Sequence, residues 1–437
     1  MPLSIGPAVQ QTRQEGMHEM TAERLLIVGN GMAADRLLDE LYHHCPGRYA
    51  ITLCGEENSA AYNRILLSPY LTGEYNEQDL FLKTHHWYRE RGIEVHLGGA
   101  VEQLKVEQGF AMTSDGRRHD FDRLVMATGS LPLSLGVEGE QLPGVMAFRT
   151  LADARYLRQL PAACRQVVVI GGGLLGIEAA YGLVQQGKQV TLLQRGQWLL
   201  NRQLDEVAGG YLQRHLQRLG IEVRLGVSTR RFIGAEHLEA LELNDGEILF
   251  ADLAVQALGV TPRTELARQA GLQVDKGILV NDQMATSASG VYALGECCQW
   301  QSQTFGLVAP IWDQARVLAR ALAGEQDGYR YQDFATRLKV SGIDLLAAGV
   351  TSSNSCLTYE DREYGHYRRI NLDEQGRISG IVLYGDVSAG NAFIDLMKQQ
   401  KQVSHLGSDL LFGPQTTALE AEPEAVEDAN EPVATAA

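Results

Sequence analysis

The sequence predicts an α/β protein in which two similar parallel-sheet units are followed by a smaller domain of mixed helix and strand. An apolar run, a glycine-rich turn, a helical stretch and a second apolar run follow one another near residue 24 and again near residue 166. That order is typical of a βαβ unit. Closer to the C-terminus, residues 364–370 and 378–383 read as antiparallel strands around a turn at 373–376, and a terminal helix is expected near Met397.

The first unit begins with a continuous apolar strand over residues 24–28. The turn Gly-Asn-Gly-Met-Ala-Ala follows at residues 29–34, and a helical pattern continues through Leu41. A second strand is predicted over residues 49–54. Because strand, turn, helix and strand fit within about 30 residues, the two strands are expected to be parallel.

The second unit repeats this order. A strand is predicted over residues 166–170, and the turn Gly-Gly-Gly-Leu-Leu-Gly follows at residues 171–176. An alanine-rich helix extends to Gln186, and a further strand covers residues 189–193.

Each glycine turn has the spacing of a dinucleotide-binding turn. The first glycine permits a tight bend, the second lets a pyrophosphate approach the backbone, and the third small residue lets helix and strand pack closely. The helix N-terminus adds N–H donors for the phosphates. These positions are Gly29, Gly31 and Ala34 in the first turn and Gly171, Gly173 and Gly176 in the second. The sequence therefore predicts two dinucleotide sites.

The residue that ends the second strand of each unit is expected to contact the adenosine ribose. In the first unit this is Glu56, whose carboxylate can accept both ribose hydroxyls; the adjacent Glu57 is the alternative. In the second unit the strand is followed by Gln194 and Arg195, with no acid. Arg195 can pair with a 2′-phosphate, whereas Gln194 can hold a 2′-hydroxyl. The residues leave the choice between NADH and NADPH open.

Composition excludes several classes of protein. Of the 437 residues, 45% are hydrophobic and 21% are charged, as in an ordinary globular chain, and the net charge of −16 argues against nucleic acid as a partner. No long uncharged apolar run predicts a membrane span. The six cysteines form no Cys-x2-Cys pair, so neither a metal site nor a short redox disulfide is expected. We expect a reduced, cytoplasmic protein.

Two interleaved Rossmann-like dinucleotide-binding domains are expected, then a small α+β domain, with disordered ends. The predicted parts are a lead at 1–22, a first dinucleotide-binding domain at 23–135 and 260–330, a second at 136–259, a C-terminal domain at 331–412 and an acidic tail at 413–437.

Further segments make a family resemblance specific. The chain resembles the electron-input half of the NAD(P)H-dependent nitrite reductase large subunit and the free-standing flavoprotein subunits of assimilatory nitrate reductases. The segments that carry this resemblance are 62–68, 122–129, 257–262, 290–296, 305–310 and 338–342. Most of the wider superfamily has Asp where this chain has Glu296. Related ferredoxin and rubredoxin reductases often place a Lys after Ser68 to pair with a helix Glu, whereas this chain has Pro69.

The resemblance implies that FAD and NAD(P)H are the cofactors and that Glu178 holds the nicotinamide carboxamide. It implies that the first dinucleotide-binding domain is the FAD-binding domain, that the second is the NAD(P)H-binding domain and that the C-terminal domain forms an interface. It also implies a set of residues beside the flavin nucleotide, some of which contribute backbone atoms. These residues are Asn63, Arg64, Val101, Ala127, Thr128, Gly129, Gly259, Gly295 and Glu296. In the family the C-terminal domain covers the flavin edge and supports a homodimer.

The expected function is transfer of electrons from NAD(P)H through flavin to an external metal-containing protein. The cysteine-rich modules that reduce nitrite in the large subunits are missing from this sequence, so the acceptor is expected to be separate, namely the catalytic subunit of an assimilatory nitrate reductase. A rubredoxin or iron–sulfur protein is an alternative acceptor. Two further alternatives are an NAD(P)H oxidase and a flavin-binding regulatory protein without enzymatic activity.

Overall fold

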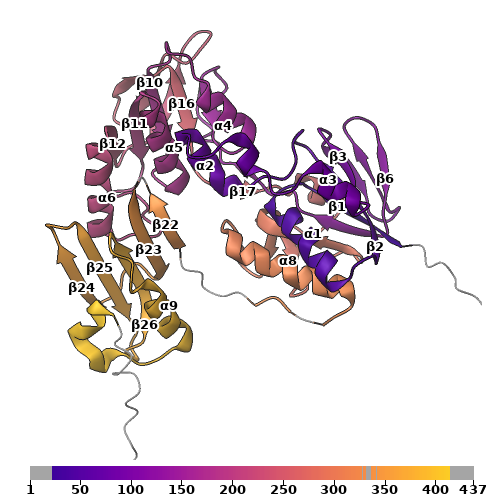
Figure 1. Ribbon diagram of the computed structural model, residues 1–437. Helices are drawn as coiled ribbons and strands as arrows, with labels where there is room; N and C mark the ends of the chain where they lie inside the picture. The colour runs from indigo at the N-terminus through magenta and orange to yellow at the C-terminus, as the bar shows by residue number, and fades with distance from the viewer. Residues whose placement is uncertain (1–21, 327, 331–335, 341, 414–437) are drawn as a thin grey trace, which may run out of the picture.

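The computed structural model describes residues 22–326, 328–330, 336–340 and 342–413. Two parallel sheets with their helices and one antiparallel sheet make up the molecule (Figure 1). The predicted lead up to residue 21 and the predicted tail from residue 414 lie outside the described residues. No helix in the described ranges has both the length and the apolar character needed to span a membrane.

The first sheet has the strand order β19-β7-β1-β2-β3, and all of its pairs are parallel. Its strands are β1 (Glu23–Val28), β2 (Tyr49–Gly55), β3 (Glu94–Leu97), β7 (Arg123–Met126) and β19 (Val291–Ala293). The last strand comes from a segment far along the chain, so the first unit is discontinuous in sequence.

The second sheet has the order β12-β11-β10-β16-β9 and is also parallel throughout. Its strands are β9 (Val145–Ala147), β10 (Gln166–Ile170), β11 (Gln189–Gln194), β12 (Ile221–Leu225) and β16 (Leu253–Gln256). The strands predicted on both sides of each glycine turn are therefore confirmed, and they lie side by side.

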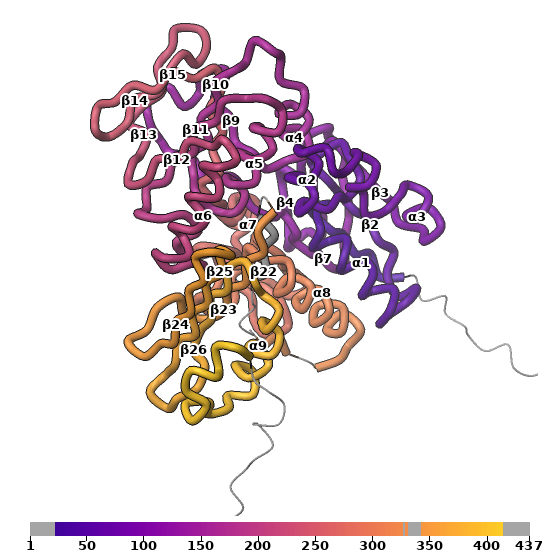
Figure 2. Tube along the Cα trace, turned by 60° about the vertical axis from the view of Figure 1, so that its left-hand side comes forward, coloured from indigo at the N-terminus to yellow at the C-terminus, as the bar shows by residue number. Residues whose placement is uncertain are grey.

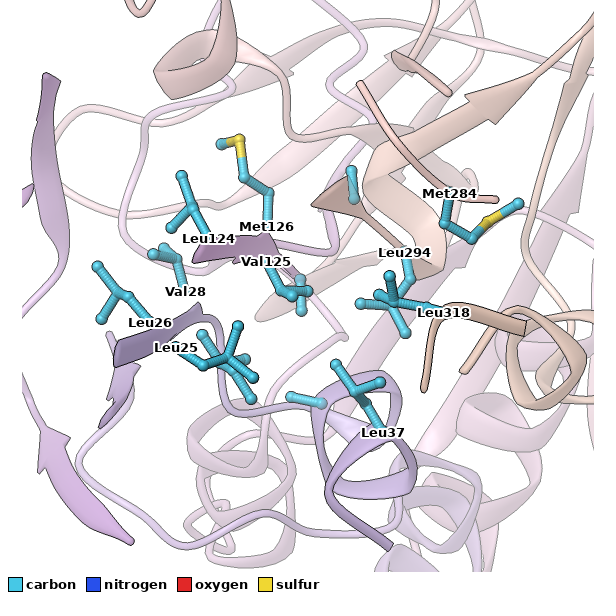
Figure 3. Packing of buried hydrophobic residues seen from close by; sticks show 14 of the residues in the cluster. Leu25, Leu26, Val28, Leu37, Leu124, Val125, Met126, Met284, Leu294 and Leu318 are labelled. Atoms are coloured by element: carbon cyan, nitrogen blue, oxygen red, sulfur yellow. The ribbon is translucent and has the colours of Figure 1, made fainter. Parts of the chain in front are cut away.

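The core of the first unit forms where α1 (Met32–His44) and α8 (Val308–Ala323) pack on its sheet. Leu25 and Leu37 are almost fully buried between the strands and α1, Leu124 is buried on the other face of the sheet, and Leu318 comes from α8 (Figure 3). The apolar runs of the strands are buried on both faces, as expected for a parallel sheet.

The two units meet through helices and a short ribbon. Helix α2 (Leu67–Thr72), which follows β2 in the chain, packs against α5 (Leu174–Gln185) of the second unit in one hydrophobic cluster. The chain passes between the units through β8 (Ser130–Pro132) and β17 (Val260–Pro262), which pair antiparallel. In the chain, β8 follows β7 of the first sheet and β17 follows β16 of the second sheet.

The remaining elements are short sheets, helices and 3-10 turns. The described residues also form three short three-stranded sheets. Two are antiparallel, made of β4 (Val101–Lys105), β5 (Phe110–Thr113) and β6 (Arg118–Asp120), and of β13 (Thr229–Ile233), β14 (Ala240–Leu243) and β15 (Ile248–Phe250). The third is mixed: β18 (Ile278–Val280) pairs parallel with β20 (Cys298–Trp300), which pairs antiparallel with β21 (Gln303–Thr304). The remaining helices are α3 (His85–Glu90), α4 (Leu151–Arg158), α6 (Glu206–Arg218) and α7 (Glu265–Gln269), with 3-10 turns η1 (Arg64–Leu66), η2 (Glu77–Leu80), η3 (Gly295–Cys297) and η4 (Ser404–Phe412).

The C-terminal domain is an antiparallel sheet with helix α9 (Gly390–Gln399). Its strand order is β22-β23-β26-β25-β24. The strands are β22 (Thr336–Val340), β23 (Ile343–Gly349), β24 (Ser355–Asp361), β25 (His366–Leu372) and β26 (Ile378–Tyr384). The predicted antiparallel pair, the turn between its strands and the terminal helix are confirmed.

This domain packs against α6 of the second unit (Figures 1 and 2). Asp205 caps α6, and its side chain accepts a hydrogen bond of 2.5 Å from the Tyr367 hydroxyl on β25. Tyr211 on α6 lies 5.5 Å, centroid to centroid, from the ring of Tyr384 on β26. Asp205 and Tyr211 therefore hold the described part of the domain against the second unit. The position over the flavin edge that the family resemblance implies stays a prediction.

Candidate functional site

A cavity of about 1220 Å³ opens where the carboxyl ends of the strands in the first sheet face the second unit. Pockets for drug-sized ligands are typically about 300–1,000 Å³, so this cavity has room for a ligand larger than those. Its lining includes residues after β1, β2 and β7 together with Leu174 and Glu178 of α5. Both units therefore contribute to one site.

The first glycine turn has the geometry of a nucleotide turn. Gly29 has a φ of +115°, and a Cβ atom there would lie 2.1 Å from the carbonyl oxygen of Ala127. Gly31 begins α1, and a Cβ atom there would meet nothing within 4 Å. Ala34 is fully buried in the first turn of α1. There is thus no room for a side chain at Gly29, whereas Gly31 borders open space at the cavity.

The second turn repeats this geometry closely. Gly171 has a φ of +120° and would place a Cβ atom 2.3 Å from the carbonyl oxygen of Ala257. A Cβ atom on Gly176 would lie 1.9 Å from the carbonyl oxygen of Gly171, whereas one on Gly173, at the start of α5, would meet nothing within 4 Å. Two copies of one backbone arrangement therefore stand at the starts of α1 and α5.

The structure brings most of the predicted first-unit residues into the cavity lining. Those that line it are Gly29, Gly31, Glu56, Arg64, Val101, Ala127, Thr128, Gly129, Glu178, Gly259, Gly295 and Glu296. The predicted residues outside the lining are Ala34, Asn63, Gly171, Gly173, Gly176, Gln194 and Arg195.

Asn63 has a local structural role that sequence reasoning missed. Its side-chain Oδ1 accepts a hydrogen bond of 3.0 Å from the Ile65 backbone and caps η1. Asn63 is not among the residues that line the cavity, and its Oδ1 is turned onto its own backbone. Its place beside a flavin stays a prediction.

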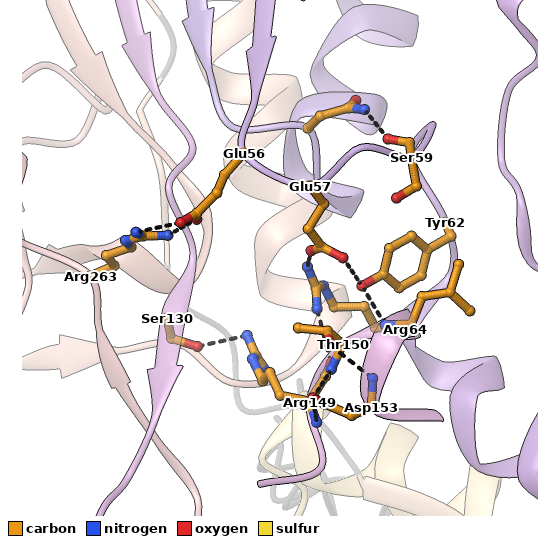
Figure 4. A network of polar contacts seen from close by, with 12 residues as sticks. Glu56, Glu57, Ser59, Tyr62, Arg64, Ser130, Arg149, Thr150, Asp153 and Arg263 are labelled. Carbon is orange, nitrogen blue, oxygen red and sulfur yellow. Dashed lines mark hydrogen bonds and ion pairs between the residues drawn. The ribbon is translucent and has the colours of Figure 1, made fainter. Parts of the chain in front are cut away.

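The two candidate ribose carboxylates have different partners, and both line the cavity (Figure 4). Glu56 is held by both terminal guanidinium nitrogens of Arg263, the residue after β17, and the Nη2 to Oε1 distance is 3.1 Å. This hydrogen bonding keeps the pKa of Glu56 below its ordinary value. Glu57 accepts from the Tyr62 hydroxyl at 2.8 Å and from Arg64 at 2.6 Å.

A second arginine in the cavity, Arg149, was missed in the sequence. Its guanidinium pairs with Glu296 and donates to the Ser130 hydroxyl at 2.7 Å, while its carbonyl accepts from Arg64 at 2.9 Å. Arg149 stands just before the capping residue Thr150 of α4. Arg149 and Glu296 lie 147 residues apart in the chain, so no local sequence pattern predicts the pair.

Gln314 on α8 holds the turn that carries Glu296. Its Oε1 accepts from the backbone N–H of Gly295 at 2.8 Å. Gly295 has a φ of +85°, and a Cβ atom there would lie 3.0 Å from that of Ala33. The glycine is thus required for the turn, and a fully buried glutamine fixes it.

Glu178 lies on α5 and faces α2 across the boundary between the units. Burial raises the pKa of its carboxyl above the ordinary value, and a hydrogen bond with the hydroxyl of Ser68 opposes this shift. Ser68 is itself buried on α2 and lines the same cavity. The pair therefore lies in the cavity lining at the boundary between the two units.

The described cysteines in and near the cavity are not suited to act as nucleophiles. Among the described residues that line it, Cys54 is the sole cysteine, and burial together with Glu94 and Asp115 raises the pKa of its thiol to about 12. Cys297 and Cys298 are free, fully buried thiols. A thiol held in its protonated form is a poor nucleophile.

The cavity fits a flavin dinucleotide on two observations. The space beside Gly31 and Gly129 admits a pyrophosphate against bare backbone, since a Cβ atom on either would meet nothing within 4 Å. The buried Oδ1 of Asn30, in the lining of the first turn, has no hydrogen-bond partner within the described part of the chain. A buried acceptor left unpaired is costly, and a hydroxyl donor of the bound group would satisfy it.

The first glycine turn lines this cavity together with residues of α5, the helix that the second glycine turn begins. Two such turns on adjoining units are typical of a flavoprotein that reacts with a pyridine nucleotide. The chain belongs to the pyridine nucleotide-disulphide oxidoreductase family, whose model matches residues 23–328. This is a family of NAD(P)H-dependent flavin oxidoreductases that bind FAD. Residues 335–401 match the rubredoxin NAD+ reductase C-terminal domain.

Individual relatives refine this picture. The chain is 35% identical to nitrite reductase [NAD(P)H] of Bacillus subtilis over 90% of its own length and 49% of the relative's. It is 34% identical to the assimilatory nitrate reductase electron transfer subunit of the same organism, over 91% and 52%. The chain thus spans about half the length of these curated relatives. A ferredoxin reductase from Rhodopseudomonas palustris has the same fold, with a TM-score of 0.79, 25% identity, and coverage of 87% of this chain and 96% of that one.

Proposed function

We propose that this chain takes electrons from NAD(P)H and delivers them singly to a separate metal-containing redox protein. The observation that carries the proposal is the cavity shared by the first glycine turn and helix α5 of the second unit, whose lining among the described residues holds no cysteine pair to accept electrons. Bound FAD would accept a hydride from the reduced nicotinamide and release its electrons one at a time. The electrons must then leave the protein.

The residues of the cavity divide the work of binding. The open backbone at Gly31 would hold the pyrophosphate of FAD and Glu56 its ribose. Glu296, oriented by Arg149, would contact the ribityl region. On the other side Gly173 would receive the pyrophosphate of the nicotinamide nucleotide, and Glu178 would hold the nicotinamide carboxamide. Holding both rings in contact in a site that excludes water is the protein's contribution to the rate.

We further propose the catalytic subunit of an assimilatory nitrate reductase as the acceptor. The support is the 34% identity with a relative that is named as the electron transfer subunit of such an enzyme. That identity extends over 91% of this chain, so it includes the C-terminal domain as well as the two nucleotide turns.

The test of the first step is anaerobic addition of NADH or NADPH to the FAD-loaded protein. We expect the visible flavin absorbance to bleach, and we expect Glu178→Ala to slow the bleaching or to weaken nucleotide binding. Glu107→Ala, at an exposed turn away from the cavity, is the control. A protein that stays yellow with both nucleotides contradicts the proposal, and wild-type kinetics in Glu178→Ala remove that residue's role.

A second candidate acceptor is a rubredoxin or ferredoxin. It is favoured by the match of residues 335–401 to a rubredoxin reductase domain and by the likeness to a ferredoxin reductase. Rapid mixing of the reduced protein with each purified acceptor separates the two candidates. Fast reoxidation by the nitrate reductase subunit alone supports the first, and fast reoxidation by the small iron protein alone supports the second. Reoxidation by dioxygen at the same rate as by either would favour an oxidase.

A further inference from the structure

The side chain of Gln194, at the end of β11, is occupied by its own unit. Its Oε1 accepts from the Gly172 backbone at 3.0 Å, and its Nε2 donates to the Trp198 carbonyl at 3.4 Å. Cβ atoms added to Gly172 and Gly196 would lie 3.0 Å and 2.9 Å from atoms of this side chain. The carboxamide is therefore packed under the glycine turn, and binding a ribose hydroxyl would require it to give up these contacts.

The segment after Gln194 is positively charged. Residues 194–204 contain Arg195 and Arg202 and no acid, in a chain whose net charge is −16. Both arginines are exposed, and within the described ranges neither forms an ion pair with a carboxylate. The next acid, Asp205, is buried and already accepts from Tyr367. The unpaired guanidinium of Arg195 thus follows the strand end where many nucleotide sites place a carboxylate, and Arg202 lies seven residues further along the chain.

The backbone that carries Arg195 is fixed. The carbonyl of Gln194 accepts from Val227 at 3.2 Å, and the carbonyl of Gly196 accepts from Gly226 at 3.1 Å. Because β10 and β11 are parallel neighbours, with Ile170 opposite Leu193, Arg195 lies at the same edge of the sheet as the second glycine turn. This edge is where the adenosine end of a nucleotide bound to that turn would lie.

We propose that Arg195 binds a 2′-phosphate, so that NADPH rather than NADH is the preferred electron donor. The inference rests on the proposed function, in which the second glycine turn holds the nicotinamide nucleotide. A carboxylate at the end of β11 would accept the ribose hydroxyls of NADH and repel a phosphate, and residues 194–204 contain none. A guanidinium forms charge-assisted hydrogen bonds with a phosphate dianion. Arg202 adds positive charge in the same segment.

Binding of nucleotide fragments tests this directly, without any flavin reaction. Calorimetric titration of the FAD-loaded protein would compare adenosine 2′,5′-bisphosphate with adenosine 5′-monophosphate. We expect the bisphosphate to bind about 10- to 100-fold more tightly. Arg195→Ala is expected to remove most of that difference while leaving the monophosphate unchanged, and Arg195→Lys to restore part of it.

Arg165→Ala is the matched control. Arg165 is an exposed arginine of the same unit immediately before β10, at the opposite edge of the sheet, so its removal changes net charge equally. Equal affinity for the two fragments, or an equal loss in both arginine variants, overturns the assignment of Arg195. In kinetics we expect a lower KM for NADPH than for NADH in the wild type and a similar KM for both in Arg195→Ala.

Failure of this inference is distinguishable from failure of the proposed function. If NADH bleaches the flavin as well as NADPH does and Arg195→Ala has no effect, the preference is wrong and the electron-transfer proposal stands. If neither nucleotide bleaches the flavin, the proposed function fails whatever the fragment affinities are.

Discussion

Glu178 and Ser68 meet where the two units face each other, and each comes from a helix that begins near a nucleotide site. Burial favours the protonated form of a carboxyl group, which is the sense of the shift at Glu178. The residue is thus suited to keep or release a proton in response to a charge that appears beside it.

A pH titration of stability tests this environment. A carboxyl whose pKa is higher in the folded than in the unfolded protein binds more protons when folded, so stability falls as pH rises through the interval between the two values. We expect the free energy of unfolding of the wild type to fall relative to that of Glu178→Gln as pH rises above the ordinary range of Glu. Urea unfolding across that range measures it, with Glu107→Gln as control; parallel curves for wild type and Glu178→Gln would contradict the assignment.

Arg149 provides a second test at this scale. Its removal leaves the carboxylate of Glu296 without its main partner in a site where both side chains are less than one-fifth exposed. We expect Arg149→Ala to lower the free energy of unfolding by about 1–3 kcal/mol. Arg268→Ala, which breaks an exposed pair with Glu265 at 3.2 Å, is expected to cost about 1 kcal/mol or less. Equal losses in the two variants would show that the Arg149 pair is ordinary surface electrostatics.

The sequence predicted the candidate site residues that a local backbone conformation requires, and it missed those whose side chains contact residues far away in the chain. Gly29 and Gly171 were found because a positive φ after a strand demands glycine at a fixed spacing. Arg149 and Arg263 were missed because their acid partners lie more than 100 residues away. The capping contact of Asn63 with its own turn was also not foreseen, because the spacing of the segment does not show which group its side chain accepts from.

At the level of elements, each strand–turn–helix segment has one glycine that the fold requires and another that only ligand binding would require. The first glycine of each turn is required by the fold, since a neighbouring carbonyl oxygen stands where a Cβ atom would be. The second glycine borders open space and is required only if something else approaches. The two glycines of one turn therefore make a matched pair for experiment.

Alanine substitution should distinguish them. We expect Gly29→Ala to lower the free energy of unfolding by more than about 2 kcal/mol, because the turn must deform. Gly31→Ala should stay within about 1 kcal/mol of the wild type, since its φ of −97° suits alanine. Its FAD affinity, measured by quenching of flavin fluorescence on titrating the flavin-free protein, should fall at least about tenfold. Unchanged FAD affinity in a folded Gly31→Ala protein would remove the pyrophosphate from this turn.

The sequence also predicted most elements that contain their own signals, such as the apolar strands β1 and β10 and the hairpin of β25 and β26. It could not say against which surface the C-terminal sheet packs. That choice depends on which face of β25 carries Tyr367 and on what the exposed side of α6 offers, and both are properties of the assembled units.

For the whole molecule, the C-terminal domain is attached through an apolar interface that contains a buried hydrogen bond between Tyr367 and Asp205. Leu345, Tyr367, Val382 and Tyr384 belong to the same hydrophobic cluster as α6 and the second sheet. The Tyr367 hydroxyl satisfies the cap of α6 from across that interface.

We expect Tyr367→Phe to lower the free energy of unfolding by about 1–3 kcal/mol, because Asp205 loses a buried donor. Tyr364→Phe, in the same domain but 71% exposed, should change it by less than about 0.5 kcal/mol. Urea unfolding measures both, and protease sensitivity of the link between the units reports whether the domain has detached. Indistinguishable stability of the two variants would mean that the domain is held by apolar contact alone.

The late position of β19 and α8 in the chain also has a consequence for synthesis on the ribosome. All five strands of the second sheet lie between residues 145 and 256. The first sheet is complete only after Val291–Ala293 has been synthesised, and its covering helix, Val308–Ala323, comes later still. The unit begun second is therefore the one completed first, while the apolar edge of β7 stays uncovered in the nascent chain. A pause in translation between residues 260 and 290 would prolong that exposure, so this is the stage at which the growing polypeptide most needs a chaperone.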